Sequence, residues 1–178
     1  MKADKAITVE VSLDRKTFRD FALFDTFVLK KRWIRPAVFC GIMTVFAIAA
    51  LLIGKEQSAL IAGVLFAVGI GLPAVYIISF LDQINSQAKK NRLSADRKIY
   101  TVTLGSEDIA VRHHRQEGET LSVKWNDIAG IYRRRSCVYI YTDKNKAFLL
   151  PDGQADVTDS ELWEYISEHA ADNDNTLK

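Results

Sequence analysis

The chain has 178 residues, a formal net charge of +2, 48% hydrophobic residues and a mean hydropathy close to zero. This length excludes a large multidomain enzyme, and 26% charged residues with three prolines and nine glycines exclude a disordered or collagen-like chain. Two cysteines are too few for a disulfide framework. These averages hide a segregation of charge along the sequence, which divides the chain into regions suited to different solvents.

Residues 1–35 are predicted to form a cytoplasmic segment with one strand and one amphipathic helix. Apolar and polar residues alternate from Ile7 to Leu13, which is the pattern of a half-buried strand. Asp14 suits the capping position of the helix, whose apolar face carries a spaced set of phenylalanines. The segment has nine Lys and Arg against five Asp and Glu, so its net charge of about +4 suits an anionic membrane surface. The helix has two possible sites, the lipid headgroup region or a face of the soluble domain.

Two apolar runs follow, at residues 36–54 and 58–81, and neither contains an Asp, Glu, Lys or Arg. At about 1.5 Å per helical residue, each run is long enough to cross a hydrocarbon layer of about 30 Å. The connection between them is so short that the two helices must be antiparallel neighbours. Residues 36–81 are therefore predicted to be a transmembrane helical hairpin. Pro73 is expected to kink the second helix.

Positive charge flanks the two outer ends of this hairpin, whereas Lys55 and Glu56 balance each other in the loop. The positive-inside rule then places both termini in the cytoplasm. The predicted anchors at the membrane interface are Lys30, Lys31, Arg32, Trp33, Arg35, Tyr76, Lys89 and Lys90. We therefore expect a multi-pass protein of the cell (inner) membrane, with the lipid bilayer as a partner.

The second run carries small residues at a strict spacing of four. These residues are Ala59, Gly63, Ala67 and Gly71. Small faces let helices approach closely, so the stripe suits either packing within one hairpin or association of several copies into a homo-oligomer. Neither run contains an ionisable side chain, and transport of ions or protons generally requires one.

Residues 97–170 are predicted to form a β-rich cytoplasmic domain, because the apolar pattern there changes to alternation. Six strands are expected, near residues 100–104, 109–113, 121–125, 128–134, 137–142 and 147–150. Trp125 and Ile128 are expected in the core. The topology of the sheet does not follow from periodicity, although a small barrel-like arrangement fits.

An amphipathic helix is predicted to close this domain, beginning near Thr158, Asp159 or Ser160. Its apolar residues Leu162, Trp163 and Ile166 are spaced to cover one end of the sheet. Residues 171–178 are expected to be a frayed tail.

Three stretches of this region resemble the YcxB-like family of bacterial membrane proteins. The stretches are Trp125-Asn126-Asp127-Ile128 leading to Tyr132, Val138-Tyr139-Ile140-Tyr141, and Phe148-Leu149-Leu150-Pro151 before the last helix. The resemblance implies a short cytoplasmic N-terminal segment, a two-helix membrane hairpin and a C-terminal cytoplasmic domain similar to the pleckstrin-homology fold. The implied fold class is an α+β membrane protein with an antiparallel β domain. Family members often follow the proline with a basic and aromatic cluster, where this chain has Asp152-Gly153-Gln154-Ala155, which argues against a ligand at that corner.

The sequence offers no pattern for catalysis, and we expect neither an enzyme nor a cofactor or metal site. His113 and His114 are adjacent on a predicted strand, so their side chains point to opposite faces and cannot easily share an ion. Cys137 lies in no recognisable motif. Nucleic acid is not an expected partner, because the region after residue 81 is slightly acidic and has no basic stripe with interleaved aromatics.

A group of basic residues is the candidate contact surface of the β-rich domain. Its members are Arg112, Arg115, Lys124, Arg133, Arg134 and Arg135. On neighbouring strands they would suit a lipid headgroup, a phosphate-bearing ligand or an acidic partner. The competing interpretation is a solvated strand end, because alternation places Arg134 opposite Arg133 and Arg135.

Together these features predict a non-enzymatic interaction or scaffold module of YcxB-like type, tethered to the membrane and displaying its β domain to a protein partner there. The alternative function is a subunit of a small oligomeric transport or channel assembly, held together by the small-residue stripe.

Overall fold

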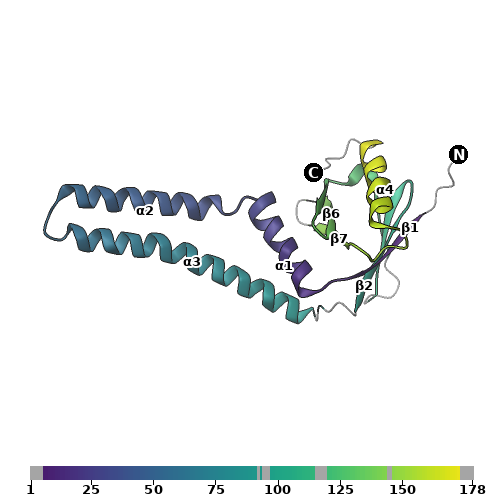
Figure 1. Cartoon of the computed structure of the whole chain (residues 1–178), viewed down its shortest axis with the longest axis horizontal. Helices are drawn as coiled ribbons and strands as arrows, with labels where there is room; N and C mark the ends of the chain where they lie inside the picture. The colour runs from purple at the N-terminus through teal and green to yellow at the C-terminus, as the bar shows by residue number, and fades with distance from the viewer. Residues whose placement is uncertain (1–5, 92, 94–96, 115–119, 144–145, 173–178) are drawn as a thin grey trace. The chain divides into compact units, whose positions relative to one another are not determined.

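The computed structural model describes residues 6–91, 93, 97–114, 120–143 and 146–172 (Figure 1). The chain divides into two compact units. One, the β unit, combines Met1–Thr17 with Leu93–Lys178, and the other, the helical unit, is Phe18–Arg92. The helical unit is thus an insertion within the β unit. This grouping differs from the predicted division, which kept residues 1–35 together.

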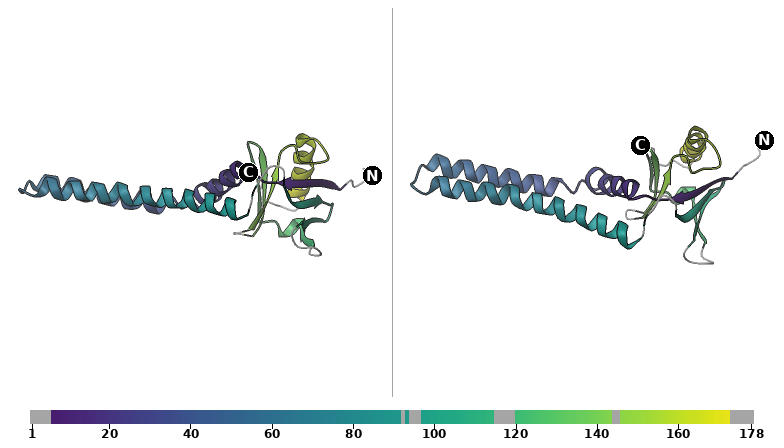
Figure 2. Two further views of the ribbon diagram at one scale, coloured as in Figure 1. Left: turned by 90° about the horizontal axis from the view of Figure 1, so that it is seen from below. Right: turned by 60° about the horizontal axis from the view of Figure 1, so that its bottom comes forward.

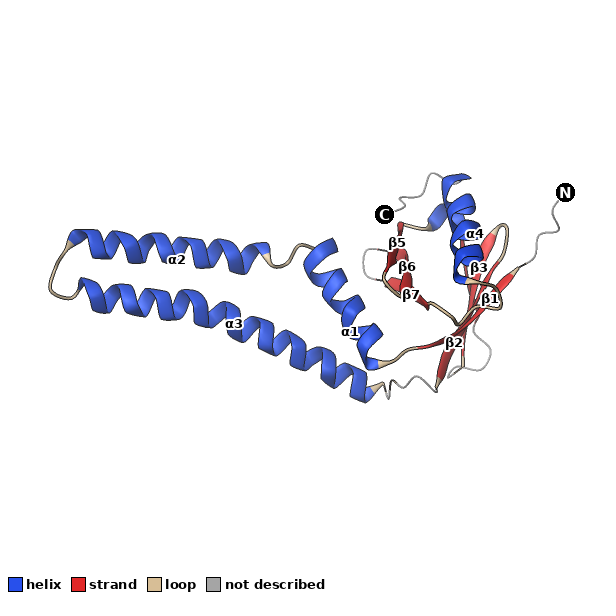
Figure 3. Cartoon of the chain, viewed as in Figure 1, coloured by secondary structure: helices blue, strands red, loops and turns tan. Residues whose placement is uncertain are grey.

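The first sheet of the β unit is antiparallel, with the strand order β1-β2-β3-β4 (Figure 3). Its strands are β1 (Ile7–Ser12), β2 (Lys98–Leu104), β3 (Asp108–His113) and β4 (Thr120–Lys124). Strand β1 pairs with β2 although residues 13–97 separate them in sequence. The alternating apolar residues of these strands explain the pairing, because Val9 and Val11 on β1 and Val102 on β2 are completely buried.

The second sheet is also antiparallel, with the order β5-β6-β7. It consists of β5 (Gly130–Arg134), β6 (Cys137–Asp143) and β7 (Lys146–Pro151). The central strand β6 is buried from Cys137 to Tyr141, as expected for an apolar run with a strand on each side. The six predicted strands are confirmed as β2 to β7. Trp125 lies in a short 3-10 turn, η2 (Trp125–Asp127), rather than in a strand, and both Trp125 and Ile128 are buried as predicted.

Helix α4 (Asp159–Asp172) closes the β unit. It begins within the predicted range, because Thr158 and Glu161 cap each other: the Glu161 N–H donates to Thr158 Oγ1 (3.3 Å), and the Thr158 N–H donates to Glu161 Oε2 (3.0 Å). Leu162 and Ile166 are buried at a spacing of four, as predicted, and Trp163 is half-buried. Of the expected frayed tail, residues 171–172 still belong to α4 and residues 173–178 lie outside the described part of the chain.

The segment after β7 covers the outer edge of β1. The Glu10 N–H donates to the Gln154 carbonyl (3.2 Å), and the Asp156 N–H donates to the Thr8 carbonyl (3.0 Å). The Gln154 side chain also accepts a hydrogen bond from the Ser12 N–H (2.8 Å) and donates one to the Ser12 carbonyl (3.0 Å). Strand β1 is therefore held on both sides, which removes an open sheet edge. Gln154 and Asp156 therefore serve a structural purpose at this edge.

The helical unit contains the main part of α1 (Arg15–Leu23), a π-helical continuation η1 (Phe24–Leu29), α2 (Ile34–Ile53) and α3 (Ser58–Lys90). Asp14 caps α1 as predicted, because its Oδ1 accepts the Thr17 N–H at 2.7 Å. Hydrogen bonds from Thr17 also hold the pKa of Asp14 below its usual range. The predicted helix does not run unbroken toward the first apolar run, since a turn at residues 30–33 separates η1 from α2.

Helices α2 and α3 lie side by side as an antiparallel hairpin (Figures 1 and 2). Gly54 ends α2 with a φ of 68°, a left-handed conformation that favours glycine. Helix α3 extends beyond the predicted end at residue 81, because residues 82–90 include good helix formers and bury Ile84 and Ala88, four residues apart, on one face.

Both helices are long and apolar enough to cross a membrane, and only 6% and 11% of their most apolar windows are buried. Large apolar side chains such as Leu52, Leu60 and Ile78 are instead exposed along the hairpin. The core helix of a soluble protein would be mostly buried.

The seam between α2 and α3 uses other small residues than the predicted stripe. Ala47, Ala62 and Gly69 are buried there, and a Cβ added to Gly69 would lie 2.8 Å from the Met43 Cβ. In the predicted stripe, Ala59, Gly63 and Ala67 are exposed and Gly71 is half-buried. A Cβ on Gly63 or Gly71 would meet nothing within 4 Å. The prediction that the two helices of the hairpin pack through this stripe is therefore wrong, because α3 contacts α2 through a face that carries Ala62 and Gly69 instead.

Candidate functional site

The turn between η1 and α2 places four basic residues close together in sequence. Its backbone is held by wide hydrogen-bonded turns, in which the Lys30 N–H donates to the Asp25 carbonyl (2.9 Å) and the Arg32 N–H donates to the Thr26 carbonyl (3.0 Å). Lys31 has a φ of 48°, a left-handed conformation that is uncommon for a residue other than glycine. The turn is therefore a defined structure and not a simple continuation of either helix.

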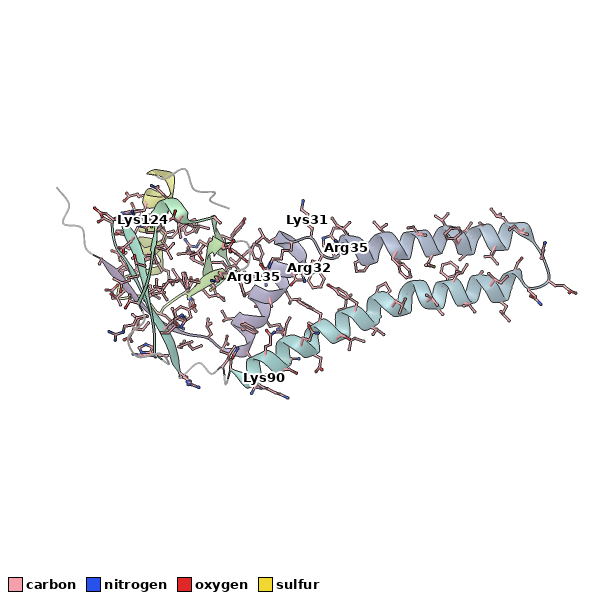
Figure 4. The ribbon with its side chains drawn as sticks, turned by 180° about the vertical axis from the view of Figure 1, so that it is seen from behind. Lys31, Arg32, Arg35, Lys90, Lys124 and Arg135 are labelled. Carbon is pink, nitrogen blue, oxygen red and sulfur yellow. The ribbon has the colours of Figure 1, made fainter. Side chains whose placement is uncertain are left out.

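This turn forms one wall of a cavity of about 900 Å³, which lies within the helical unit. The volume is within the range of about 300–1,000 Å³ typical of ligand pockets. Its lining residues are Lys30, Lys31, Arg32, Arg35, Pro36 and Phe39 from the turn and α2, with Leu72, Pro73 and Tyr76 from α3. We call this cavity the basic pocket. Figure 4 labels Lys31, Arg32 and Arg35, which lie where the turn meets the start of α2.

The charge of the basic pocket is unbalanced. Lys30 forms an ion pair with Asp25 (Nζ to Oδ2, 2.8 Å), and the two side chains are 26% and 17% exposed. Lys31, Arg32 and Arg35 have no carboxylate within ion-pair distance among the described residues. The positive end of the α2 helix dipole adds to these three charges. The pocket therefore favours an anion.

Pro73 explains why a cavity forms at this level of the hairpin. It lies inside α3, and a proline there lacks the N–H for a helical hydrogen bond and crowds the carbonyl of residue 69, which favours a bend. Helix α3 diverges from α2 beyond the middle of the hairpin (Figure 1). Phe39 and Leu72 line the resulting space with apolar surface, beside the ring of Tyr76.

Five of the eight predicted interface anchors line the basic pocket, namely Lys30, Lys31, Arg32, Arg35 and Tyr76. Trp33 is outside the lining and exposed, and Lys89 and Lys90 are exposed in the last turn of α3. The sequence interpretation did not identify Phe39, Leu72 and Pro73 as the apolar part of one site. Pro73 was the available signal, because a kink in one helix of a hairpin opens space against the other.

The arginines proposed as a contact surface of the β unit do not gather on neighbouring strands. Arg133 and Arg134 belong to β5 and Arg112 belongs to β3, which is in the other sheet. Arg135 follows β5 in an exposed turn, and Lys124 ends β4 (Figure 4). Arg115 lies outside the described residues. Arg112 and Arg133 thus lie on strands of separate sheets and not on adjacent strands, and a shared contact surface stays a prediction.

Arg133 has a specific contact within the β unit. Its guanidinium lies over the Trp163 ring of α4, at 5.2 Å from the ring centroid, a distance that suits a cation–π interaction. The Arg133 side chain is therefore already engaged in a contact within the protein.

The histidines and the soluble-domain cysteine occupy structural positions. His113 packs edge-on against Tyr100 (5.6 Å between ring centroids), whereas His114 Nε2 lies 3.1 Å from Thr101 Oγ1. Burial raises the pKa of the Cys137 thiol to about 12, so that little thiolate exists at neutral pH. In the described part of the chain, no three His, Cys, Asp or Glu side chains are grouped to hold a metal ion.

Comparison with known proteins gives one match. The family model described as YcxB-like protein matches residues 105–167, from the turn before β3 to the middle of α4. No curated protein and no solved structure matches the chain. The matched segment contains the three stretches on which the sequence resemblance rested, and that resemblance is confirmed. Residues 105–167 of this chain therefore match the YcxB-like family model.

Proposed function

We propose that the protein is a non-enzymatic interaction module anchored in the cell membrane by the α2–α3 hairpin, with both termini in the cytoplasm. The observation that supports this most is the exposure of the hairpin, whose most apolar windows are only 6% and 11% buried. Helix α2 has 20 residues, a length of about 30 Å, which matches the hydrocarbon layer of a bilayer.

The pairing of β1 with β2 supports the proposed topology. Strand β1 precedes the hairpin and β2 follows it, and the two strands are hydrogen-bonded neighbours. This pairing supports the proposal that both flanks of the hairpin lie on one side of the membrane. The basic residues at these flanks favour the cytoplasmic side.

The architecture of the β unit supports the proposal of a pleckstrin-homology-like fold. A four-stranded and a three-stranded antiparallel sheet, closed by a C-terminal helix, are the elements that the family resemblance implies. Shared architecture does not transfer an activity. The function that follows from anchoring is physical: a partner at the membrane meets the β unit at a raised effective concentration.

The topology is tested by fusing a reporter that is active only in the cytoplasm to each terminus, and a reporter that is active only outside to the loop at Lys55 and Glu56. We expect all three fusions to be active. The matched control exchanges the two kinds of reporter, and each exchanged fusion should be silent. A silent cytoplasmic reporter at either terminus would refute the proposal.

One observation favours the alternative of an oligomeric assembly in the membrane. The stripe of Ala59, Gly63, Ala67 and Gly71 stays largely exposed after the hairpin has packed, so it remains open to a second copy. The mass of the protein in mild detergent tests this function. A strict monomer would exclude it, whereas an oligomer that Gly63→Ile dissociates, and exposed Val64→Ile does not, would support it.

A further inference from the structure

We propose that the basic pocket binds the headgroup phosphate of one anionic phospholipid, with the start of an acyl chain on its apolar wall. This inference rests on the proposed insertion of the hairpin into the membrane. It goes further by assigning one lipid to a defined pocket. A general attraction of the basic flanks to anionic lipid would instead be diffuse and would involve no defined site.

The depth of the pocket is right for a headgroup. Helix α2 begins at Ile34, and its 20 residues reach about 30 Å to the loop at the far end. Tyr76 lies 18 residues beyond Ser58, the first residue of α3, and this corresponds to about 27 Å. Both walls of the basic pocket therefore lie where a hydrocarbon layer of about 30 Å ends and the phosphates begin.

The lining matches the two chemical parts of a phospholipid. Arg32 and Arg35 offer planar guanidinium groups that suit phosphate oxygens, and Lys31 adds a third cation without a carboxylate partner among the described residues. Phe39 and Leu72 form apolar surface in the same cavity. An inorganic phosphate would use the cations alone, whereas a lipid uses both parts, so we assign the pocket to a lipid.

The turn is held in place without the ligand, which reduces the cost of ordering on binding. The ion pair of Lys30 with the largely buried Asp25 fixes the start of the turn. Lys31, the next residue in the chain, has a left-handed backbone conformation. Residues in this conformation carry a cost and often mark ligand clamps.

The proposal predicts that removing two positive charges from the pocket weakens lipid retention more than removing two positive charges elsewhere. Diffuse attraction would depend on the number of Lys and Arg residues within about a Debye length of the bilayer and not on which of them line the pocket. Lys89 and Lys90 are two exposed cations at the end of α3, outside the pocket lining. They match Arg32 and Arg35 in number and sign of charge, and Arg32→Lys with Arg35→Lys is a second control, which keeps both charges at the depth of the pocket but removes the planar guanidinium groups.

The test measures lipids retained by the full-length protein, purified in mild detergent, by native mass spectrometry after addition of equimolar phosphatidylglycerol and phosphatidylcholine. We expect one phosphatidylglycerol to be retained in preference to phosphatidylcholine. Arg32→Gln with Arg35→Gln should weaken this retention at least about tenfold, since each nearby cation contributes roughly fivefold. Lys89→Gln with Lys90→Gln should change it less than about twofold, and Arg32→Lys with Arg35→Lys should still weaken it, because an ammonium group cannot reproduce the bidentate contact of a guanidinium. Glycerol phosphate in excess should not displace the lipid.

Equal retention of the two lipids by the unmodified protein would overturn the inference without reference to any variant. Equal losses in the two double variants to Gln would overturn it in favour of diffuse attraction, and displacement by glycerol phosphate would overturn the assignment to a lipid. Extraction of membranes with alkaline carbonate separates these failures from failure of the proposed anchor. A protein released by carbonate refutes membrane insertion itself, whereas a protein that stays in the membrane but lacks lipid preference refutes only the lipid site.

Discussion

At the scale of single residues, the β unit uses its chemically reactive side chains for packing. The Trp125 indole donates from Nε1 to the Gly105 carbonyl (2.8 Å) and lies 5.3 Å from the His169 ring of α4, measured between centroids. It thereby joins the turn before β3 to the closing helix. Tyr100 is similar, because its hydroxyl donates to the Leu149 carbonyl (2.9 Å) and burial raises its pKa. Such groups stabilise the contact between elements.

Cys137 gives a prediction at this scale. Cys137 is only 2% exposed, and burial raises the pKa of its thiol from 9.0 to about 12. In a Cys40→Ala background, we expect a maleimide at pH 8 to label Cys137 only after denaturation. Because the folded pKa is the higher one, the neutral thiol stabilises the fold fully below pH 9 and loses this contribution as the pH rises toward 12.

Rapid labelling of the native protein would contradict this position of Cys137. The control is Ser106→Cys in the same background with Cys137→Ala, because Ser106 is exposed in the turn before β3. That thiol should react at the rate of a free cysteine.

At the scale of elements, β1 depends on the segment at Gln154 as much as on its neighbour β2. The Gln154 side chain makes three hydrogen bonds with Ser12, to its N–H, its carbonyl and its hydroxyl. These bonds cover the edge that β1 would otherwise present to solvent.

We expect Gln154→Ala to lower the free energy of local opening of β1 by about 1–3 kcal/mol, because it leaves part-buried backbone groups of Ser12 unpaired. Hydrogen exchange of the β1 amides measures this change directly. Gln57→Ala, in the exposed loop of the hairpin, is the matched control and should leave β1 unchanged. Equal exchange rates for the two variants would show that the edge contact does not stabilise the strand.

At the scale of the whole molecule, the β unit is built from two pieces of chain that flank an insertion. Ser12 and Lys98 are partners in the ladder, so the two points at which the chain leaves and returns are neighbours in the sheet. A short hairpin turn can connect such positions. The helical unit is therefore removable in principle without breaking a strand.

We expect a chain in which residues 14–96 are replaced by a four-residue glycine-containing turn to be soluble and folded. Residues 97–170 alone should aggregate, because they lack β1, whose Val9 and Val11 are completely buried, and expose the edge of β2. Size-exclusion chromatography and the dispersion of amide signals in NMR spectra measure the difference. A soluble, folded 97–170 fragment would show that β1 is dispensable.

The sequence predicted the local elements well, because they depend on the spacing of apolar residues over short distances. Alternation located β1 to β7 within a few residues, and the capping residues Asp14 and Thr158 located the starts of α1 and α4. The basic residues of the pocket were also singled out from the sequence, as predicted interface anchors. Their apolar counterpart in the pocket was not, because Phe39 and Leu72 meet only when α2 and α3 pack as a bent pair.

The sequence by itself determined that this protein has two long apolar segments, positive flanks and a β-rich part that resembles the YcxB-like family, since charge and periodicity are properties of neighbouring residues. Only the tertiary structure decided which distant residues share a surface. It placed β1 in the sheet of β2, separated Arg112 from Arg133, and brought five of the predicted anchors around one cavity. The physical reason is that such groupings depend on backbone hydrogen bonds between remote strands and on the bend of α3 at Pro73, and no local pattern encodes either.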